Sequence, residues 1–194
     1  MLMDLIRARR SVRDYKIKEV PHGLITEVIE AARFAPSGCN AQPWQYFIVY
    51  KRKDFLRLKD NNVFPQGFVY ESPCMIICCG DPSSYEHPES YERQITDRTL
   101  PQDIDLKMNK FFSSRLKERT IRDVAVASTY LVLRAEERGL GTCYVGWFNE
   151  AALKHTLGIR DDFVVPFVIT VGYGAEKPQQ TPRKRLDEIL HFVE

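Results

Sequence analysis

The sequence predicts a single domain that combines helices and strands, in an α+β or an α/β arrangement. The chain has 194 residues, which suits one domain with a substantial core. Hydrophobic residues make up 44% and charged residues 28%, which is ordinary for a globular protein. Patterns typical of helices and of strands follow one another along residues 1–194, without a repeat, a low-complexity tract or a domain linker.

Apolar residues at helical spacing predict the helices. A longer helix begins at Pro21, because proline favours the first helical position, and it ends before Pro36. Its apolar face follows an amphipathic pattern and consists of Leu24, Ile25, Val28, Ile29 and Ala32. Short helices are predicted around Leu2, Leu5 and Ile6, over 53–59 and over 150–157.

Four runs of β-branched, aromatic and other apolar residues predict strands over 46–50, 74–79, 142–147 and 163–171. Cys78 and Cys79 are adjacent in one of these runs, so their side chains should point to opposite faces of the sheet. That geometry favours core packing over metal ligation. From Asp81 to Arg119 the pattern weakens, and a variable lid or excursion is predicted there.

A long central helix is predicted after Thr120, which with Asp123 three residues later has the spacing of an N-cap pair. From Val124 to Leu133 this helix is apolar on nearly every face, and Gly139 is its predicted C-cap. A helix that is apolar all round must be covered all round. A second subunit is therefore expected to supply part of the cover.

The charge balance is close to neutral, with 28 basic and 26 acidic side chains and a net charge of +2. It gives no general reason to expect nucleic acid or an anionic membrane as a partner. The longest apolar stretch is about half a membrane span, and the first residues lack a secretory pattern. The five cysteines are odd in number, which favours reduced thiols and a cytoplasmic location over a disulfide framework.

Two clusters of basic residues are candidates for binding a phosphate group. Arg7, Arg9, Arg10 and Arg13 surround Ser11, and Arg183-Lys184-Arg185 lies near the other end of the chain. Guanidinium groups offer fixed donor pairs that suit a phosphate dianion. Either cluster on its own is more simply explained as a solvated basic surface.

Other kinds of site are poorly supported by the sequence. Gly139-Leu140-Gly141 and Gly172-Tyr173-Gly174 both lack the third glycine of a dinucleotide-binding motif, and there is no phosphate-loop pattern. The four histidines are scattered without metal-ligand spacing, so no metal is predicted. Cys39 lies in a loop and is a candidate nucleophile, but nothing in the sequence places a general base beside it. The shortage of evident catalytic side chains favours an enzyme whose cofactor carries the chemistry.

Several segments resemble one known family, and they come in the same order. Arg9-Arg10-Ser11-Val12-Arg13 is similar to the opening motif of the nitroreductases, and Pro36-Ser37-Gly38-Cys39-Asn40-Ala41-Gln42-Pro43-Trp44 resembles their Pro-Ser-x-x-Asn-x-Gln-Pro-Trp loop. Residues 135–146 resemble the family's segment beside the flavin, and 168–173 its last strand. Arg183-Lys184-Arg185 lies where the family pattern has a pair of basic residues separated by one residue. Ser128-Thr129 and the 81–119 region depart from the family pattern.

The resemblance implies an α+β sandwich, with a central mixed but mainly antiparallel sheet flanked by helices and a C-terminal arm exchanged within a homodimer. It also implies FMN at the dimer interface. The flavin phosphate and ribityl chain would be bound by Arg9, Arg10, Ser11, Arg13, Arg183 and Arg185. The flavin bound by the partner would be contacted by Pro36, Ser37, Gly38 and Asn40. The flavin ring would be lined by Tyr144, Val145 and Gly146. No side chain is assigned a catalytic role, since flavin N5 carries the chemistry.

The implied activity is a two-step cycle in which NADH or NADPH delivers hydride to flavin N5 and leaves, after which a nitroaromatic, quinone or similar acceptor is reduced. Two alternatives remain open at this point. The fold could serve a different flavin reaction, such as flavin fragmentation, dehalogenation or ring oxidation, or it could be a flavin-binding sensor without turnover. The sequence leaves undecided the acceptor, the choice between NADH and NADPH, the role of 81–119 and any redox role of Cys39.

Overall fold

The computed structural model describes residues 2–85 and 114–193. Its helices are α1 (Leu2–Ala8), α2 (His22–Arg33), α3 (Arg52–Asp60), α4 (Phe68–Glu71), α7 (Leu116–Glu137) and α8 (Glu150–Leu157). Its strands are β1 (Trp44–Val49), β2 (Cys74–Gly80), β3 (Gly141–Val145) and β4 (Val164–Gly172). Single 3-10 turns are η1 (Gly38–Asn40), η2 (Pro82–Tyr85) and η3 (Leu186–Glu188). None of the helices in the described part of the chain is both long and apolar enough to cross a membrane.

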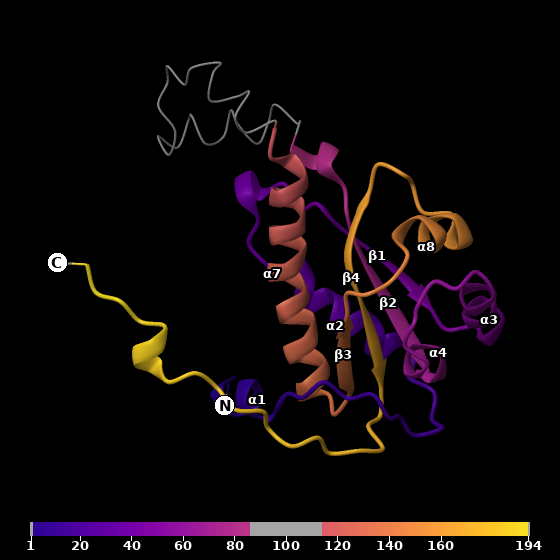
Figure 1. Cartoon of the computed structure of the whole chain (residues 1–194), viewed down its shortest axis with the longest axis horizontal. Coiled ribbons are helices and arrows are strands. Elements are labelled where there is room, and N and C mark those ends of the chain that lie inside the picture. Colours follow the sequence, from indigo (N-terminus) through magenta and orange to yellow (C-terminus); the bar gives the residue numbers. More distant parts are fainter. Residues whose placement is uncertain (1, 86–113, 194) are drawn as a thin grey trace.

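The four strands form one sheet in the order β1-β2-β4-β3, and each neighbouring pair runs antiparallel. Helices α2 and α7 cover one face of this sheet, and α3, α4 and α8 lie on the other (Figure 1). The predicted α+β class is thus confirmed. Long-range pairing of β2 with β4 makes these two strands the centre of the sheet.

The sheet separates two hydrophobic cores. Cys78 packs in the core that includes Val28 of α2 and Leu131 of α7, whereas Cys79 packs in the core that includes Phe55 of α3 and Leu153 of α8. The prediction that the two cysteines face opposite sides of a strand is therefore confirmed. All seven residues of β2 are buried, because both faces of this central strand are covered.

The predicted start of the central helix is wrong. α7 begins at Leu116, and Thr120 lies inside it, with its hydroxyl donating a 2.7 Å hydrogen bond back to the carbonyl oxygen of Leu116. Thr120 is completely buried against Gly80, where even a Cβ would meet its methyl group at 2.3 Å. A threonine that bonds the preceding turn satisfies its hydroxyl within the helix and has no capping role.

The predicted 81–119 excursion is shorter than expected at its end, because residues 116–119 already belong to α7. Its beginning includes the turn η2, and residues 86–113 lie outside the described residues. Strand β3 also ends earlier than predicted, at Val145, and Trp147 beyond it is 73% exposed. The one-turn helix α4 was not predicted.

Residues after Gly174 form an arm that leaves the body of the domain (Figure 1). Apart from the single turn η3, its described part has no helix or strand. All residues from 181 to 193 are exposed. The outer part of the arm, residues 181–193, is therefore not packed against the described part of its own chain, and its exchange with a second copy stays a prediction.

Candidate functional site

The basic segment that follows α1 runs along the edge of the sheet. The backbone N–H of Val12 donates a 2.9 Å hydrogen bond to the carbonyl of Thr142, and Ser11 forms a parallel bridge with Thr142. This contact is close because Gly141 has no side chain: a Cβ there would meet Val12 at 2.8 Å. The segment is thereby fixed beside β3.

Successive residues of the segment have different surroundings. The guanidinium of Arg10 donates hydrogen bonds to the carbonyl oxygens of Arg7, Ala8 and Arg9, so it caps the end of α1. Arg10 also lines a cavity of about 390 Å³ that opens between α1, the end of α7 and the base of the arm. The structure thus gives Arg10 a local structural role, and its predicted contact with a phosphate stays a prediction.

Arg9 and Arg13 lie near β3. Burial raises the pKa of the Cys143 thiol, and the positive charges of Arg13 and Arg9 partly oppose that rise. Burial likewise raises the pKa of the Tyr144 hydroxyl, with Arg9 again among the opposing influences. Two cationic side chains, Arg9 and Arg13, are therefore close enough to act on the strand that carries the predicted flavin contacts.

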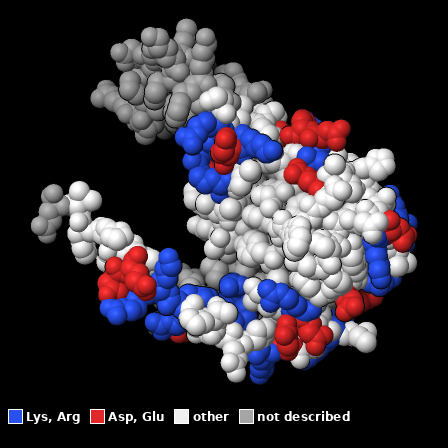
Figure 2. All heavy atoms as spheres, viewed as in Figure 1, with Lys and Arg blue, Asp and Glu red and all other residues white. Residues whose placement is uncertain are grey.

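Glu176 from the base of the arm holds the backbone of this segment. Its carboxylate accepts hydrogen bonds from the N–H groups of Arg13, at 2.6 Å, and Asp14, at 3.1 Å. The N–H of Lys16 continues the contact by donating to the carbonyl of Tyr173 at 2.8 Å. Sequence reasoning missed Glu176, because a carboxylate that binds backbone donors leaves no motif. Figure 2 shows basic side chains gathered around α1 and the base of the arm.

The end of β3 presents an open surface. Tyr144 is 38% exposed, and its ring packs edge-on against Phe167 with 5.0 Å between the ring centroids. Val145 is buried, but a Cβ placed on Gly146 would have no atom within 4 Å. There is therefore open space beside the backbone of Gly146 in the part of the chain that the structure describes.

The loop from Ser37 to Gln42 contains backbone strain. Cys39, Asn40 and Gln42 have φ values of 58°, 53° and 47°, although none is glycine. Left-handed backbone of this kind costs free energy in residues with a Cβ, and it is concentrated at functional sites. Ser37 stabilises the loop from within, since its hydroxyl accepts a 2.9 Å hydrogen bond from the N–H of Gln42.

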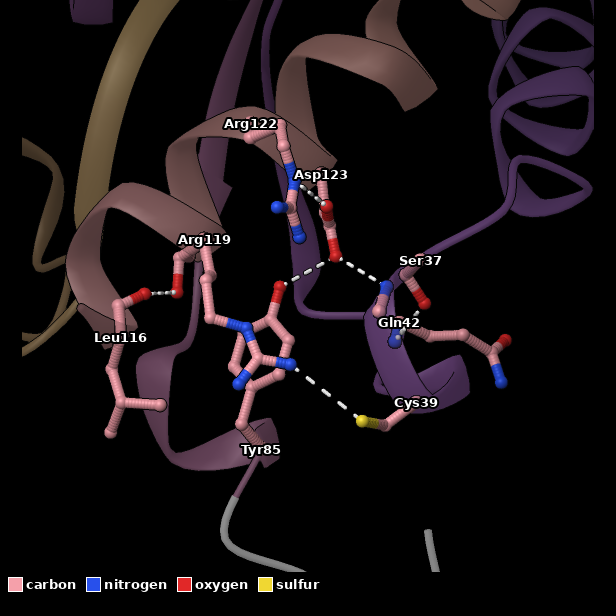
Figure 3. A network of polar contacts seen from close by, with 10 residues as sticks. Ser37, Cys39, Gln42, Tyr85, Leu116, Arg119, Arg122 and Asp123 are labelled. Carbon is pink, nitrogen blue, oxygen red and sulfur yellow. Dashed lines mark hydrogen bonds and ion pairs between the residues drawn. The ribbon is translucent and has the colours of Figure 1, made fainter. Parts of the chain in front are cut away.

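Asp123 of α7 connects this loop to the rest of the domain (Figure 3). One carboxylate oxygen accepts from the N–H of Gly38 at 2.7 Å and from the hydroxyl of Tyr85 at 2.8 Å. The other accepts from Nε of Arg122 at 2.9 Å. Asp123, expected to help cap the helix, instead binds a separate segment. Sequence reasoning missed this role and Tyr85; the available signal was an acidic residue on the buried face of α7, beside Thr120 and Val124.

Arg183 and Arg185 lie on the arm. Arg183 donates hydrogen bonds to Thr181 and Pro182, and Arg185 forms an ion pair with Asp187. Both arginines are exposed, and the hydrogen bonds and ion pair described for them are to neighbours on the arm. The convergence of the two basic clusters on one phosphate stays a prediction.

Comparisons with known proteins agree on one family. The sequence model described as Nitroreductase family matches residues 6–173. A Methanothermobacter thermautotrophicus protein, provisionally named as an NADH dehydrogenase/NAD(P)H nitroreductase, is 30% identical over 183 residues, covering 91% of this chain and 79% of that protein. The NADH dehydrogenase of Thermus thermophilus is 27% identical over 190 residues, covering 94% and 91%.

The fold agrees as well. The crystal structure of an Exiguobacterium sibiricum protein, provisionally named as a nitroreductase and solved in complex with FMN, superposes with a TM-score of 0.80 at 20% identity, covering 100% of this chain and 97% of that one. The family match includes the segment beside β3, the strained loop and the end of β3, whereas Arg183 and Arg185 lie beyond it. This chain belongs to the nitroreductase family.

Proposed function

We propose that the protein is an FMN-dependent oxidoreductase that takes hydride from NADH or NADPH and reduces a small acceptor such as a nitroaromatic or a quinone. The observation that supports the proposal is the hydrogen-bonded alignment of residues 11–13 beside β3, the strand that leads to the open backbone at Gly146. The provisional name of the M. thermautotrophicus relative supports NADH or NADPH as the reductant.

The residues present suit FMN, which combines a phosphate dianion with a flat, largely apolar ring. Arg9 and Arg13 supply positive charge near β3, and Ser11 supplies a hydroxyl in the same segment. The absence of any atom within 4 Å of a Cβ on Gly146 leaves room for a ring. FAD has no terminal phosphate monoester, so this donor set favours FMN. The E. sibiricum structure in complex with FMN supports the same choice.

The proposed binding residues divide into three groups. Arg9, Arg10, Ser11 and Arg13, with Arg183 and Arg185, would hold the phosphate and ribityl chain; Tyr144, Val145 and Gly146 would line the ring; Pro36, Ser37, Gly38 and Asn40 would contact the flavin of a second copy. When bound, FMN supplies a hydride-accepting and hydride-donating N5, which lets reductant and acceptor use one pocket in turn.

The chain's own side chains bind and orient in this scheme. Guanidinium groups compensate the phosphate charge, and charge-assisted hydrogen bonds of this type are about twice as strong as neutral ones. Burial raises the pKa of Tyr144, so its hydroxyl stays protonated at neutral pH and remains a hydrogen-bond donor. No side chain is assigned to transfer a proton to the acceptor.

A second copy of the chain would complete the site. The outer side of α7 leaves Ile121, Val126 and Tyr130 exposed by 36%, 36% and 43%. Further large apolar side chains are exposed on α1 and on the arm: Leu2, Met3, Ile6, Leu186, Ile189, Leu190, Phe192 and Val193. An exposed apolar surface of this extent is typical of an interface. We therefore propose a homodimer, in the cytoplasm, where the five free cysteines stay reduced.

The test begins with the purified full-length protein. It should be yellow, and mass spectrometry of the released chromophore should identify FMN at about one per chain. Anaerobic NADH or NADPH should bleach the flavin absorbance, and a nitroaromatic or quinone should restore it. FAD as the main species would refute the phosphate assignment, and bound FMN that neither reductant bleaches would favour a sensor without turnover.

A further inference from the structure

The carboxylate of Asp123 joins three separate parts of the chain. It accepts hydrogen bonds from Gly38 in the strained loop, from Tyr85 in η2 and from Arg122 on its own helix. The side chain of Asp123 is only 4% exposed. Burial and the hydrogen bond to Asp123 raise the pKa of the Tyr85 hydroxyl, which therefore remains a donor. A buried carboxylate with three donors is well compensated, and losing it leaves those donors without an acceptor.

The loop and helix α7 come close together at Gly38. A Cβ at this position would lie 3.2 Å from a terminal nitrogen of Arg119 and 3.3 Å from one of Arg122. The guanidinium of Arg119 covers the ring of Tyr85, 4.7 Å from its centroid, and donates to the sulfur of Cys39 at 3.6 Å. Figure 3 shows these side chains converging on the loop from α7 and η2.

The strained backbone of the loop lies directly beside its hydrogen bond to Asp123, which clamps the loop to α7. Cys39 and Asn40, which follow Gly38 directly, have left-handed backbone conformations that unconstrained non-glycine residues rarely adopt. Such conformations persist where surrounding contacts enforce them. Two side chains of α7 bond this loop: Asp123 accepts from the N–H of Gly38 at 2.7 Å, and Arg119 donates to the sulfur of Cys39 at the longer distance of 3.6 Å. The shorter bond, to a buried carboxylate, is of the stronger kind.

We propose that Asp123 is the positioning residue of the loop 37–42: it holds the Gly38 amide, and through it Ser37 and Asn40, in the conformation that contacts the flavin. Tyr85 orients the carboxylate from the opposite side. The proposal rests on the proposed function for the identity of the ligand, but the clamp itself is a property of this chain. Asp123 is not among the proposed flavin-binding residues, so in this proposal it acts through the loop.

Cys39 offers a direct readout of the loop that needs no flavin. It is half-buried, whereas Cys74, Cys78, Cys79 and Cys143 are at most 2% exposed. The rate at which iodoacetamide alkylates each cysteine, followed by mass spectrometry of the full-length protein without added flavin, separates loop opening from general unfolding. The dissociation constant of FMN, measured by fluorescence titration, is the second readout.

Four variants are compared with the wild type. Asp123→Ala removes the clamp, and Asp123→Asn keeps an oxygen that can accept from Gly38 and Tyr85. Tyr85→Phe removes one donor to the carboxylate. Tyr70→Phe is the matched control, because Tyr70 is also buried and, among the described residues, its hydroxyl bonds only the backbone of Phe64, at 2.8 and 3.0 Å.

Asp123→Ala should raise the alkylation rate of Cys39 and the FMN dissociation constant by about ten- to a hundredfold each. The four buried cysteines should keep their wild-type rates. Asp123→Asn should recover most of both changes, Tyr85→Phe should shift both in the same direction by less, and Tyr70→Phe should change neither.

Unchanged alkylation of Cys39 and unchanged FMN affinity in Asp123→Ala would overturn the proposal. It would also be overturned if Cys39 became reactive only together with the buried cysteines in both Asp123→Ala and Tyr85→Phe, since Asp123 would then be an ordinary core residue. If the wild type binds no FMN but Asp123→Ala selectively exposes Cys39, the FMN assignment would be wrong. The role of Asp123 in positioning the loop would still be supported.

Discussion

The hydroxyl groups of Ser128 on α7 and Tyr144 on β3 lie 2.9 Å apart. Ser128 is 1% exposed, so the pair fixes the phenol end of a ring whose outer part faces solvent. Ser128 departs from the family pattern that the sequence resembles, and the structure gives it a specific partner. The Tyr144 ring is thereby held between α7 and Phe167 at the proposed flavin surface.

Ser128→Ala should lower the free energy of unfolding by about 1 kcal/mol, because the buried hydroxyl of Tyr144 loses a partner. Urea denaturation measures this change. Thr26→Ala is the control: Thr26 lies on α2, and its exposed hydroxyl bonds only the carbonyl of His22. Equal destabilisation of the two variants would show that the Ser128–Tyr144 contact has no special weight.

Arg13→Ala and Arg185→Ala should each weaken FMN binding by about one to two decades, since a charge-assisted hydrogen bond contributes roughly 1.5–3 kcal/mol. The melting temperature of the flavin-free protein should change little. Arg33→Ala is a matched control, because Arg33 is an exposed arginine paired only with Glu30 in the described structure. FMN affinity at the wild-type level in both test variants would mean that the clusters are surface charge.

Val126→Asp should abolish the dimer and the bound flavin together. Val126 is 36% exposed in the single chain, so the aspartate would be tolerated there but would be buried in an interface formed by α7. An interface with exchanged arms should bury on the order of 2,000–5,000 Å² and leave no stable monomer. Sedimentation velocity follows the change.

The control for Val126→Asp is Leu56→Asp, on the opposite side of the sheet, where Leu56 is 47% exposed on α3. This variant should remain a yellow dimer. A folded, yellow monomer in either protein would contradict the shared-site arrangement, and with it the assignment of Ser37 and Asn40 to a partner's flavin.

Cys39→Gly and Ala41→Gly should have opposite effects on stability. Cys39 has a φ of 58°, where glycine is favoured by roughly 1 kcal/mol, so the free energy of unfolding should rise or stay level. Ala41 has a φ of −65° and a ψ of −26°, where glycine only adds flexibility to the unfolded chain and should destabilise by about 0.5–1 kcal/mol. Destabilisation by Cys39→Gly as large as that by Ala41→Gly would show that the loop is unstrained.

The protein should lose stability steeply above pH 9. Burial raises the pKa of Cys74 and of Cys79 from 9.0 to about 12. Below pH 9 both the folded and the unfolded state keep these protons. Between pH 9 and 12 only the unfolded state releases them, so the free energy of unfolding falls by about 1.4 kcal/mol per pH unit for each thiol.

Buried tyrosines add to this loss above pH 10, since burial also raises the pKa of Tyr46. Urea titrations from pH 8 to 11 measure the slope, and the double variant Cys74→Ala, Cys79→Ala should be correspondingly less steep. A urea midpoint that stays constant over this range would contradict the predicted burial of the thiols.

The strands could be predicted from the sequence because each is a short apolar run whose identity depends on its own residues. The run 74–79 matches β2 to within one residue, and the run 163–171 matches β4 as closely. The helix α2 was likewise defined by local signals, a proline before it and a proline beyond it. Local chemistry decided all of these elements.

The errors came where distant contacts override local patterns. Thr120 and Asp123 have the spacing of an N-cap pair, but both lie within α7. There Thr120 packs against Gly80, and Asp123 accepts a hydrogen bond from the N–H of Gly38. Arg10 was grouped with its neighbours in sequence, yet its guanidinium caps the end of α1. The roles of Tyr85 and Glu176 depend on partners 38 and more than 100 residues away, which no spacing rule can supply.

The contacts of residues 11–16 with Thr142 and Tyr173 also set an order of events during translation. The ribosome makes Arg9 and Arg13 well before it makes Thr142 and Tyr173, the backbone acceptors on which their positions beside β3 depend. Because domains fold as their residues emerge from the N-terminus onward, this segment must wait for β3 and β4. A nascent chain that ends before β4 therefore contains all the arginines of the first cluster but lacks the folded sheet edge that positions them.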